Sequence, residues 1–172
     1  MRFRIEQDFA TDPVTLCAAL VDPRYLTEAM GRLPDIAAPI VVSQDRDDGK
    51  GTVRQLLQYA FNGRLPSAVT HFISPDRLTW IEDSTINMAS QTAVFRITPV
   101  HYKHFFTCSG TWTIDPRPGG CARILDGSLT VNSPVPFVGG KVEKAIVSGL
   151  RERLDKEPAA FEWWRETFGK SV

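Results

Sequence analysis

The 172-residue sequence has no net charge and no long apolar run, and these two absences exclude several classes of protein. Twenty Lys and Arg residues balance twenty Asp and Glu residues, which argues against nucleic-acid or polyanion binding as the main activity. No apolar stretch approaches the roughly 18 residues needed to cross a bilayer, so we expect no stable membrane insertion. The N-terminus alternates charged and apolar residues and lacks the apolar core of a signal peptide, which favours a cytoplasmic location.

Cysteine and histidine are scarce, with three of each. The cysteines are Cys17, Cys108 and Cys121. They form no CxxC pair, so we interpret them as reduced and mostly buried thiols. His101 and His104 lie at a predicted hairpin tip without a neighbouring Cys, Asp or Glu, and His71 stands alone, so neither matches a common zinc site. We therefore expect no metal and no cofactor.

The first part of the chain combines a strand pattern with two helix-start signals. Residues 2–9 alternate between charged and mostly apolar side chains, which predicts a half-buried strand. Asp12–Pro13 and Asp22–Pro23 each place a capping side chain before a proline, which suits the first position of a helix. We therefore predict two short helices after the strand, the second carrying Tyr25 and ending at Gly31.

Residues 36 to 132 are dominated by strand patterns separated by turn residues. We predict six strands here, at 36–44, 52–61, 77–86, 91–100, 105–114 and 121–131. In the last two, apolar side chains gather mainly on one face while Thr and Ser gather on the other. This alternation indicates an antiparallel sheet with one face toward water.

A long helical segment from Lys141 to Phe168 ends the chain, and if unbroken it would span about 42 Å. Its apolar stripe comprises Val142, Ala145, Ile146, Gly149, Leu150, Leu154, Phe161, Trp164 and Phe168. Pro158 lacks a backbone donor, so we predict a kink or break near residues 154–157. The charged residues around this point indicate a solvated helix face; they are Arg151, Glu152, Arg153, Asp155, Lys156 and Glu157.

This order of elements predicts one α+β domain over residues 1–172: a seven-stranded curved antiparallel sheet, with two short helices after the first strand and the long C-terminal helix packed over it. A bent sheet and a straight helix leave a gap, and such a gap is the default position for a mostly apolar pocket. The expected ligand-binding walls are Tyr59, Trp80, Phe95, Ile97, Phe106, Cys108, Trp112, Arg123, Leu125, Leu129, Ile146, Gly149 and Leu150.

Three polar residues fall in register with apolar strand positions, namely Gln55, Glu82 and Arg123. If they point inward they must be paired or hydrogen-bonded, and they would then mark specificity or catalysis. Alternatively, they lie at strand ends or a bulge turns them outward. Gly149 likewise has two interpretations, because it either makes room for a ligand or allows the helix to pack closely on the sheet.

Two aromatic residues also leave alternatives open. Tyr25 either gates a pocket mouth or belongs to the core with its hydroxyl at the edge. Trp163 either packs on the short helices or remains exposed as a contact surface.

Several sequence motifs resemble the START-like (helix-grip, SRPBCC) superfamily, and a functionally uncharacterised bacterial family within it most of all. They are the stretch Val135-Pro136-Phe137-Val138-Gly139-Gly140-Lys141-Val142-Glu143-Lys144, the ending Phe161-Glu162-Trp163-Trp164, the early Asp22-Pro23-Arg24-Tyr25-Leu26 and the loop Leu65-Pro66-Ser67. The resemblance covers essentially the whole chain. It implies a helix-grip fold with a hydrophobic-ligand cavity and no particular reaction, because this fold hosts binders and enzymes alike.

The function predicted from these features is binding or carriage of a small hydrophobic or amphipathic molecule in the internal cavity. One alternative is a cyclase or dehydratase, in which Arg123, Glu82 or Tyr59 would hold or protonate a substrate carbonyl. Another is a protein-interaction module with a filled core, which would allow a homodimer. The sequence leaves open whether any reaction is catalysed, and it assigns no catalytic residue.

Overall fold

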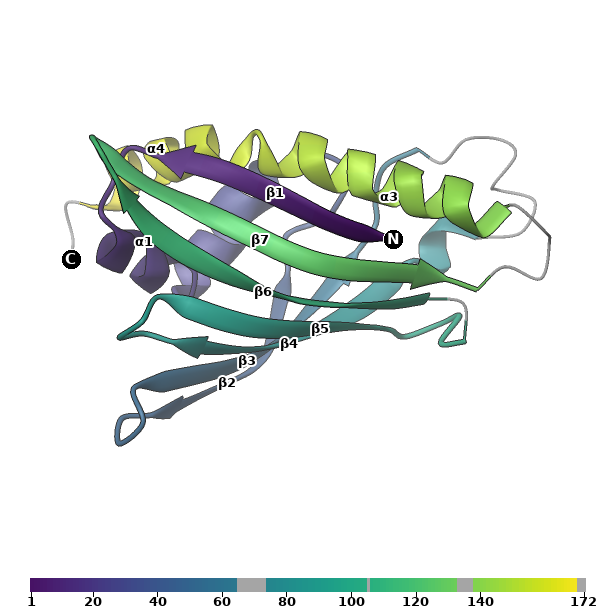
Figure 1. The fold of residues 1–172 in the computed structure, drawn as a ribbon, viewed down its shortest axis with the longest axis horizontal. Coiled ribbons are helices and arrows are strands. Elements are labelled where there is room, and N and C mark those ends of the chain that lie inside the picture. The colour runs from purple at the N-terminus through teal and green to yellow at the C-terminus, as the bar shows by residue number, and fades with distance from the viewer. Residues whose placement is uncertain (65–73, 105, 133–137, 170–172) are drawn as a thin grey trace.

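The computed structural model describes residues 1–64, 74–104, 106–132 and 138–169 (Figure 1). The elements are β1 (Arg2–Phe9), α1 (Pro13–Ala19), η1 (Tyr25–Ala29), η2 (Met30–Arg32), β2 (Ile40–Asp47), β3 (Thr52–Ala60), η3 (Pro75–Arg77), β4 (Thr79–Asn87), β5 (Thr92–Pro99), β6 (Phe106–Arg117), β7 (Gly120–Val131), α3 (Val138–Leu154) and α4 (Glu157–Phe168). No helix in these ranges is long and apolar enough to cross a membrane.

The seven strands form one antiparallel sheet in the order β1-β7-β6-β5-β4-β3-β2. The sheet is strongly curved, and the C-terminal helices lie on its concave side (Figure 1). This architecture confirms the predicted α+β helix-grip fold. Because directly paired residues share a face of the sheet, the register carries the apolar face from strand to strand along the concave side.

Several predicted strand boundaries are wrong by a few residues. β2 begins at Ile40 rather than at residue 36, since Pro39 cannot donate to a strand ladder and Ile36 makes only an isolated bridge to Phe61. β6 extends to Arg117 instead of ending at residue 114, so the connection to β7 is shorter than the predicted strands imply. Gly119 accommodates this tight turn with a φ of 81°.

The two short helical segments differ in type. α1 forms as predicted, because the Asp12 side chain caps the helix by accepting a hydrogen bond from the Thr15 backbone N–H at 2.9 Å. The second segment is not a regular helix but a π turn, η1, followed by a 3-10 turn, η2, which contains Gly31 instead of ending at it. Tyr25, Leu26 and Ala29 of η1 are buried in the core.

The C-terminal helix breaks where the sequence predicts, because α3 ends at Leu154 and α4 begins at Glu157. Pro158 lacks the backbone N–H that would otherwise bond to the Leu154 carbonyl one turn earlier. The side chain of Gln7 replaces that donor, since its Nε2 donates to Leu154 O at 2.6 Å. The break therefore leaves the Leu154 carbonyl paired.

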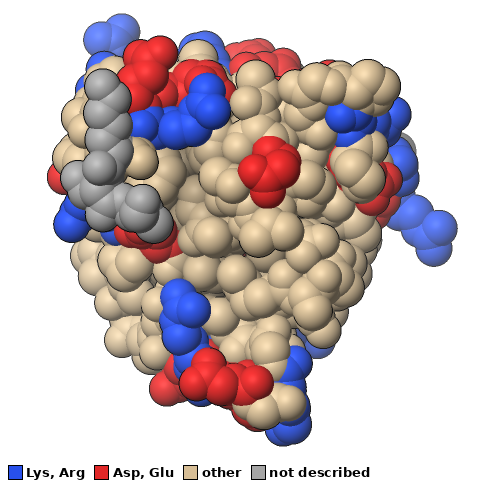
Figure 2. All heavy atoms as spheres, turned by 90° about the vertical axis from the view of Figure 1, so that its left-hand side faces the viewer, with Lys and Arg blue, Asp and Glu red and all other residues tan. Residues whose placement is uncertain are grey.

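Much of the buried core lies at one end of the concave face, where α1, η1 and α4 pack against the sheet. Phe161 of α4 is fully buried there and makes edge-to-face contacts with Phe9 and Tyr25. Figure 2 shows the outer surface of this end, where charged side chains gather mainly toward the margins. We call this end of the concave face the closed end.

Candidate functional site

Helix α3 does not lie over the middle of the sheet. Its main contacts are with β7 and β1 (Figure 1). Polar contacts fix it there: Glu143 accepts a hydrogen bond from the Val131 backbone at 2.9 Å, and Arg151 donates to Arg4 O at 3.0 Å. The concave face of the strands beyond β7 is therefore only partly covered by this helix.

Exposure along the concave face follows this asymmetry. Ile86 and Val53 at the closed end are each 1% exposed. Farther along the same face, Trp80, Ile97 and Phe106 remain only half-buried although their register points them inward. Solvent therefore reaches an inward-facing apolar surface, which with the facing side of α3 we call the concave site.

The helix side of the concave site is the row Val142, Ile146, Gly149 and Arg153, which repeats at helical spacing. Arg153 of this row reaches the segment before β2, so the row faces across the concave surface rather than toward β1. Ile146 is 37% exposed, and a Cβ added at Gly149 would meet no atom within 4 Å. Close helix–sheet packing is therefore the wrong explanation for this glycine.

The buried face of α3 is rotated from the predicted stripe. Ala145 and Gly149 are exposed, whereas Val147, which the stripe omits, is buried together with Leu154. The rotation follows from the placement of the helix over β7 and β1. A stripe read at spacings of three and four cannot show which flank of the helix meets the sheet.

All the predicted wall residues on strands face the concave side, but they divide into two groups. Tyr59, Phe95, Cys108, Trp112 and Leu129 are buried and form part of the packed core, and Arg123 is buried as well. Trp80, Ile97, Phe106 and Leu125 are half-buried, as is Leu150 on α3. The strand residues of the second group lie on the accessible part of the concave face, while Ile146 and Gly149 on α3 are exposed.

Gln55, Glu82 and Arg123 all point inward, so neither a strand end nor a bulge turns them toward solvent. Gln55 has a structural role, because its Nε2 donates to Leu20 O at 3.4 Å and its Oε1 accepts from Gln44 at 3.3 Å. These bonds tie the end of α1 to the sheet.

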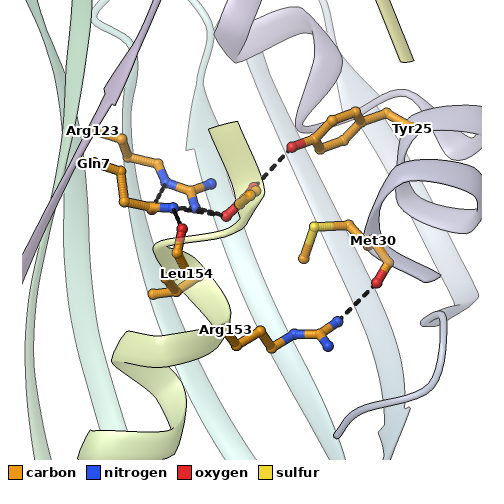
Figure 3. A network of polar contacts seen from close by, with 7 residues as sticks. Gln7, Tyr25, Met30, Arg123, Arg153 and Leu154 are labelled. Atoms are coloured by element: carbon orange, nitrogen blue, oxygen red, sulfur yellow. Dashed lines mark hydrogen bonds and ion pairs between the residues drawn. The ribbon is translucent and has the colours of Figure 1, made fainter. Parts of the chain in front are cut away.

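Arg123 belongs to a buried network that joins β1, β7, η1 and α4 (Figure 3). Its guanidinium forms an ion pair with Glu157 and donates from Nε to Gln7 Oε1 at 2.9 Å. Gln7 Nε2 lies 3.1 Å from Glu157 Oε2, and the Tyr25 hydroxyl donates to Glu157 Oε1 at 2.9 Å. Glu157 is 0% exposed and satisfied by donors from three elements.

The electrostatics of this network favour the charged form of Arg123. Burial alone disfavours the charged form of Arg123, but the Glu157 carboxylate and further negative groups raise the guanidinium pKa above its ordinary value. Burial, and then the charge of Glu157, raise the pKa of Tyr25 well above its ordinary value. Tyr25 is 0% exposed and its hydroxyl is bonded to Glu157, so it is a core residue and not a pocket gate.

The sequence interpretation of Arg153 and Glu157 as a solvated helix face is wrong. Arg153 is 4% exposed and donates to the carbonyls of Met30, Pro34 and Ile36 at 2.9, 2.7 and 3.1 Å. Burial lowers its pKa. One sequence feature could have indicated the burial of Glu157. Gln7 is a polar residue at an inward position of β1, and together with Arg123 it requires hydrogen-bond partners from another element.

Glu82 differs from these satisfied groups. It lies on the concave face of β4, paired with Leu57 on β3 and Ile97 on β5, and is half-buried. Its carboxyl makes no hydrogen bond or ion pair within the described part of the chain. Burial raises its pKa from 4.5 to about 7, with Arg123 opposing the shift and Glu157 adding to it.

Two hydroxyls near Glu82 in the sheet also lack partners among the described residues. Tyr59 stacks on Trp80 with ring centroids 5.7 Å apart, and its hydroxyl makes no hydrogen bond to another described residue. Ser84 Oγ is buried and likewise has no partner in these ranges. Unpaired polar groups in apolar surroundings are unusual in folded proteins and mark a place where another molecule can supply the missing bonds.

The remaining candidates contribute little to this site. His101 and His104 are exposed, and the described ranges contain no group of three residues able to hold a metal ion. All three cysteines are free and buried. Trp163 packs against the short helical segment, with the Arg32 guanidinium 3.9 Å from its ring centre. His71, the Leu65-Pro66-Ser67 loop and residues 133–137 lie outside the described residues.

Solved structures share this fold. A protein from Thermus thermophilus superposes with a TM-score of 0.65 at 16% identity, covering 100% of both chains. The Zhui aromatase/cyclase from Streptomyces sp. R1128 gives 0.67 at 12% identity, covering 100% of this chain and 99% of that one. A START superfamily protein from Mycobacterium smegmatis gives 0.56 at 15% identity, covering 93% and 98%. These similarities establish a START-like fold.

Sequence comparison identifies a family but no characterised relative. No curated protein matches the chain at a significant level. The family model described as "Protein of unknown function (DUF2505)" matches residues 4–164, and the chain therefore belongs to this family.

Proposed function

We propose that the protein binds a small apolar or amphipathic molecule in the concave site. The observation that carries the proposal is the half-buried state of Trp80, Ile97 and Phe106 on the inward face of the sheet. A monomeric protein normally buries such a face completely. Here the facing row of α3 presents Gly149, which leaves the space free.

The driving force for binding would be the burial of this apolar surface. A two-ring aromatic molecule that buries about 250 Å² of apolar surface would gain about 6 kcal/mol before the entropic cost of association is subtracted. The incompletely covered inward face also argues against the protein-interaction module, which requires a filled core.

A cyclase-type enzyme is the second candidate, and one specific observation favours it. Glu82 has a pKa raised to about 7 and no partner among the described residues, which are properties of a group that exchanges a proton near neutral pH. The Zhui aromatase/cyclase shares the fold at 12% identity. Binding is the common requirement of both candidates.

The test is a fluorescence titration with N-phenyl-1-naphthylamine, an uncharged apolar probe. We expect saturable binding to the wild type and at least tenfold weaker binding to Gly149→Leu, because an added Cβ meets no atom within 4 Å and the larger side chain would take up space on the facing row of α3. Ser148→Leu, on the exposed side of α3, is the matched control and should bind like the wild type. No saturable binding to the wild type, or equal binding by both variants, would show that the concave site is not the binding site.

A further inference from the structure

We propose that Glu82 selects the ligand by donating a hydrogen bond, as a neutral carboxylic acid, to a carbonyl oxygen of an otherwise apolar molecule. The inference rests on the proposed binding function and adds the chemical class of the ligand: an uncharged ketone, ester or similar carbonyl compound. It also makes Glu82 the specificity-determining residue of the concave site.

The position of Glu82 separates it from the carboxylates that have structural partners. Glu157 is enclosed by three donors, and Asp83, the next residue along β4, points to the opposite face and pairs with Arg54 at 2.8 Å. Glu82 instead faces the concave site, accompanied by apolar Leu57 and Ile97. Within the described residues its hydrogen-bonding capacity is unused.

The charged and titratable groups around Glu82 come from four other elements: Tyr59 on β3, Cys108 on β6, Arg123 on β7 and Glu157 on α4. The strongest potential partner, Arg123, already forms an ion pair with Glu157. Burial therefore dominates, and the carboxyl keeps its proton up to a pH of about 7. A ligand that displaces water from Glu82 increases this effect, so the complex contains the neutral acid.

A neutral carboxyl has one O–H donor, and a buried donor must find an acceptor. A carbonyl oxygen supplies that acceptor without introducing charge. A cationic ligand is disfavoured by the positive charge of Arg123, which already acts on Glu82. An anionic ligand would find Arg123 paired and Arg153 bound to three carbonyls.

The test compares two probes that differ only in a carbonyl group, 6-propionyl-2-(dimethylamino)naphthalene and 6-propyl-2-(dimethylamino)naphthalene. We expect the wild type to bind the ketone at least tenfold more tightly at pH 6. Glu82→Leu should abolish this preference, whereas Glu82→Gln should retain most of it because its amide still donates. Asp83→Asn, on the outer face, is the matched control and should behave like the wild type.

The pH dependence gives a second readout. Because only the protonated carboxyl donates, the wild-type affinity for the ketone should fall roughly thirtyfold between pH 5.5 and 8.5, while Glu82→Gln should show no such fall. Equal ketone preference in Glu82→Leu, or a flat wild-type profile, overturns the inference. If the propyl probe still binds in that case, the proposed function survives; if neither probe binds the wild type, both proposals fail.

Discussion

Replacing Glu157 with glutamine tests whether the buried network holds the two C-terminal helices onto the sheet. The substitution preserves shape but removes the negative charge opposite Arg123 and converts one acceptor oxygen into a donor. Arg123 is itself buried, so its positive charge would then have no counter-ion.

The magnitude follows from the burial of both partners. Removing one member of a buried ion pair costs about 3–5 kcal/mol, because the other charge stays desolvated. A domain of this size has a total free energy of unfolding of about 5–15 kcal/mol, so the variant should be close to its folding threshold. The exposed pair Arg54–Asp83 provides the matched comparison, and Asp83→Asn should cost no more than about 1 kcal/mol.

Urea unfolding at pH 7, followed by tryptophan fluorescence, measures both losses. Arg123→Met combined with Glu157→Gln removes both charges, so its loss should be at least about 2 kcal/mol smaller than the sum of the two single losses. This double variant also keeps the comparison measurable if Glu157→Gln alone does not fold. Strict additivity, or a Glu157→Gln loss no larger than that of Asp83→Asn, would refute the reasoning.

Two further predictions concern the inward polar residues. Gln7→Met leaves Leu154 O without its side-chain donor and Arg123 without one of its two acceptors, so it should lower the free energy of unfolding by about 2–3 kcal/mol in urea melts. A loss below about 0.5 kcal/mol contradicts this. Glu82 ionises near pH 4.5 when unfolded and about 7 when folded, so its ionisation destabilises the fold as the pH rises through this window. The stability of Glu82→Gln relative to the wild type should therefore increase by roughly 1–3 kcal/mol between pH 4 and pH 8. The same difference at both pH values would contradict this.

Features that depend on neighbouring residues were predictable from the sequence. The alternation in residues 105–114 places Phe106, Cys108 and Trp112 on one face, and the register confirms this. Pro158 predicts the helix break because a missing N–H acts one turn away, wherever the rest of the chain lies. The Asp12 cap is local in the same way.

Features that depend on distant parts of the chain were not predictable in this way. Glu157 has the sequence surroundings of an exposed helical carboxylate, and its burial depends on Gln7, Tyr25 and Arg123, the nearest of which is 34 residues away in sequence. Arg153 is buried against backbone carbonyls of residues 30–36, and a backbone carbonyl cannot be recognised as a partner from the residue type. Composition and periodicity cannot reveal partners that only the fold brings together.

The attachment of α3 to one edge of the sheet has a consequence for the energetics of recognition. Glu143 and Arg151 tie the helix to β7 and β1, and the Leu154 carbonyl is fixed by Gln7. None of these bonds has to break for a guest molecule to lie against Trp80 or Ile97. The framework is thus preorganised, and most of the binding free energy would be retained as affinity instead of being consumed in rearranging the host.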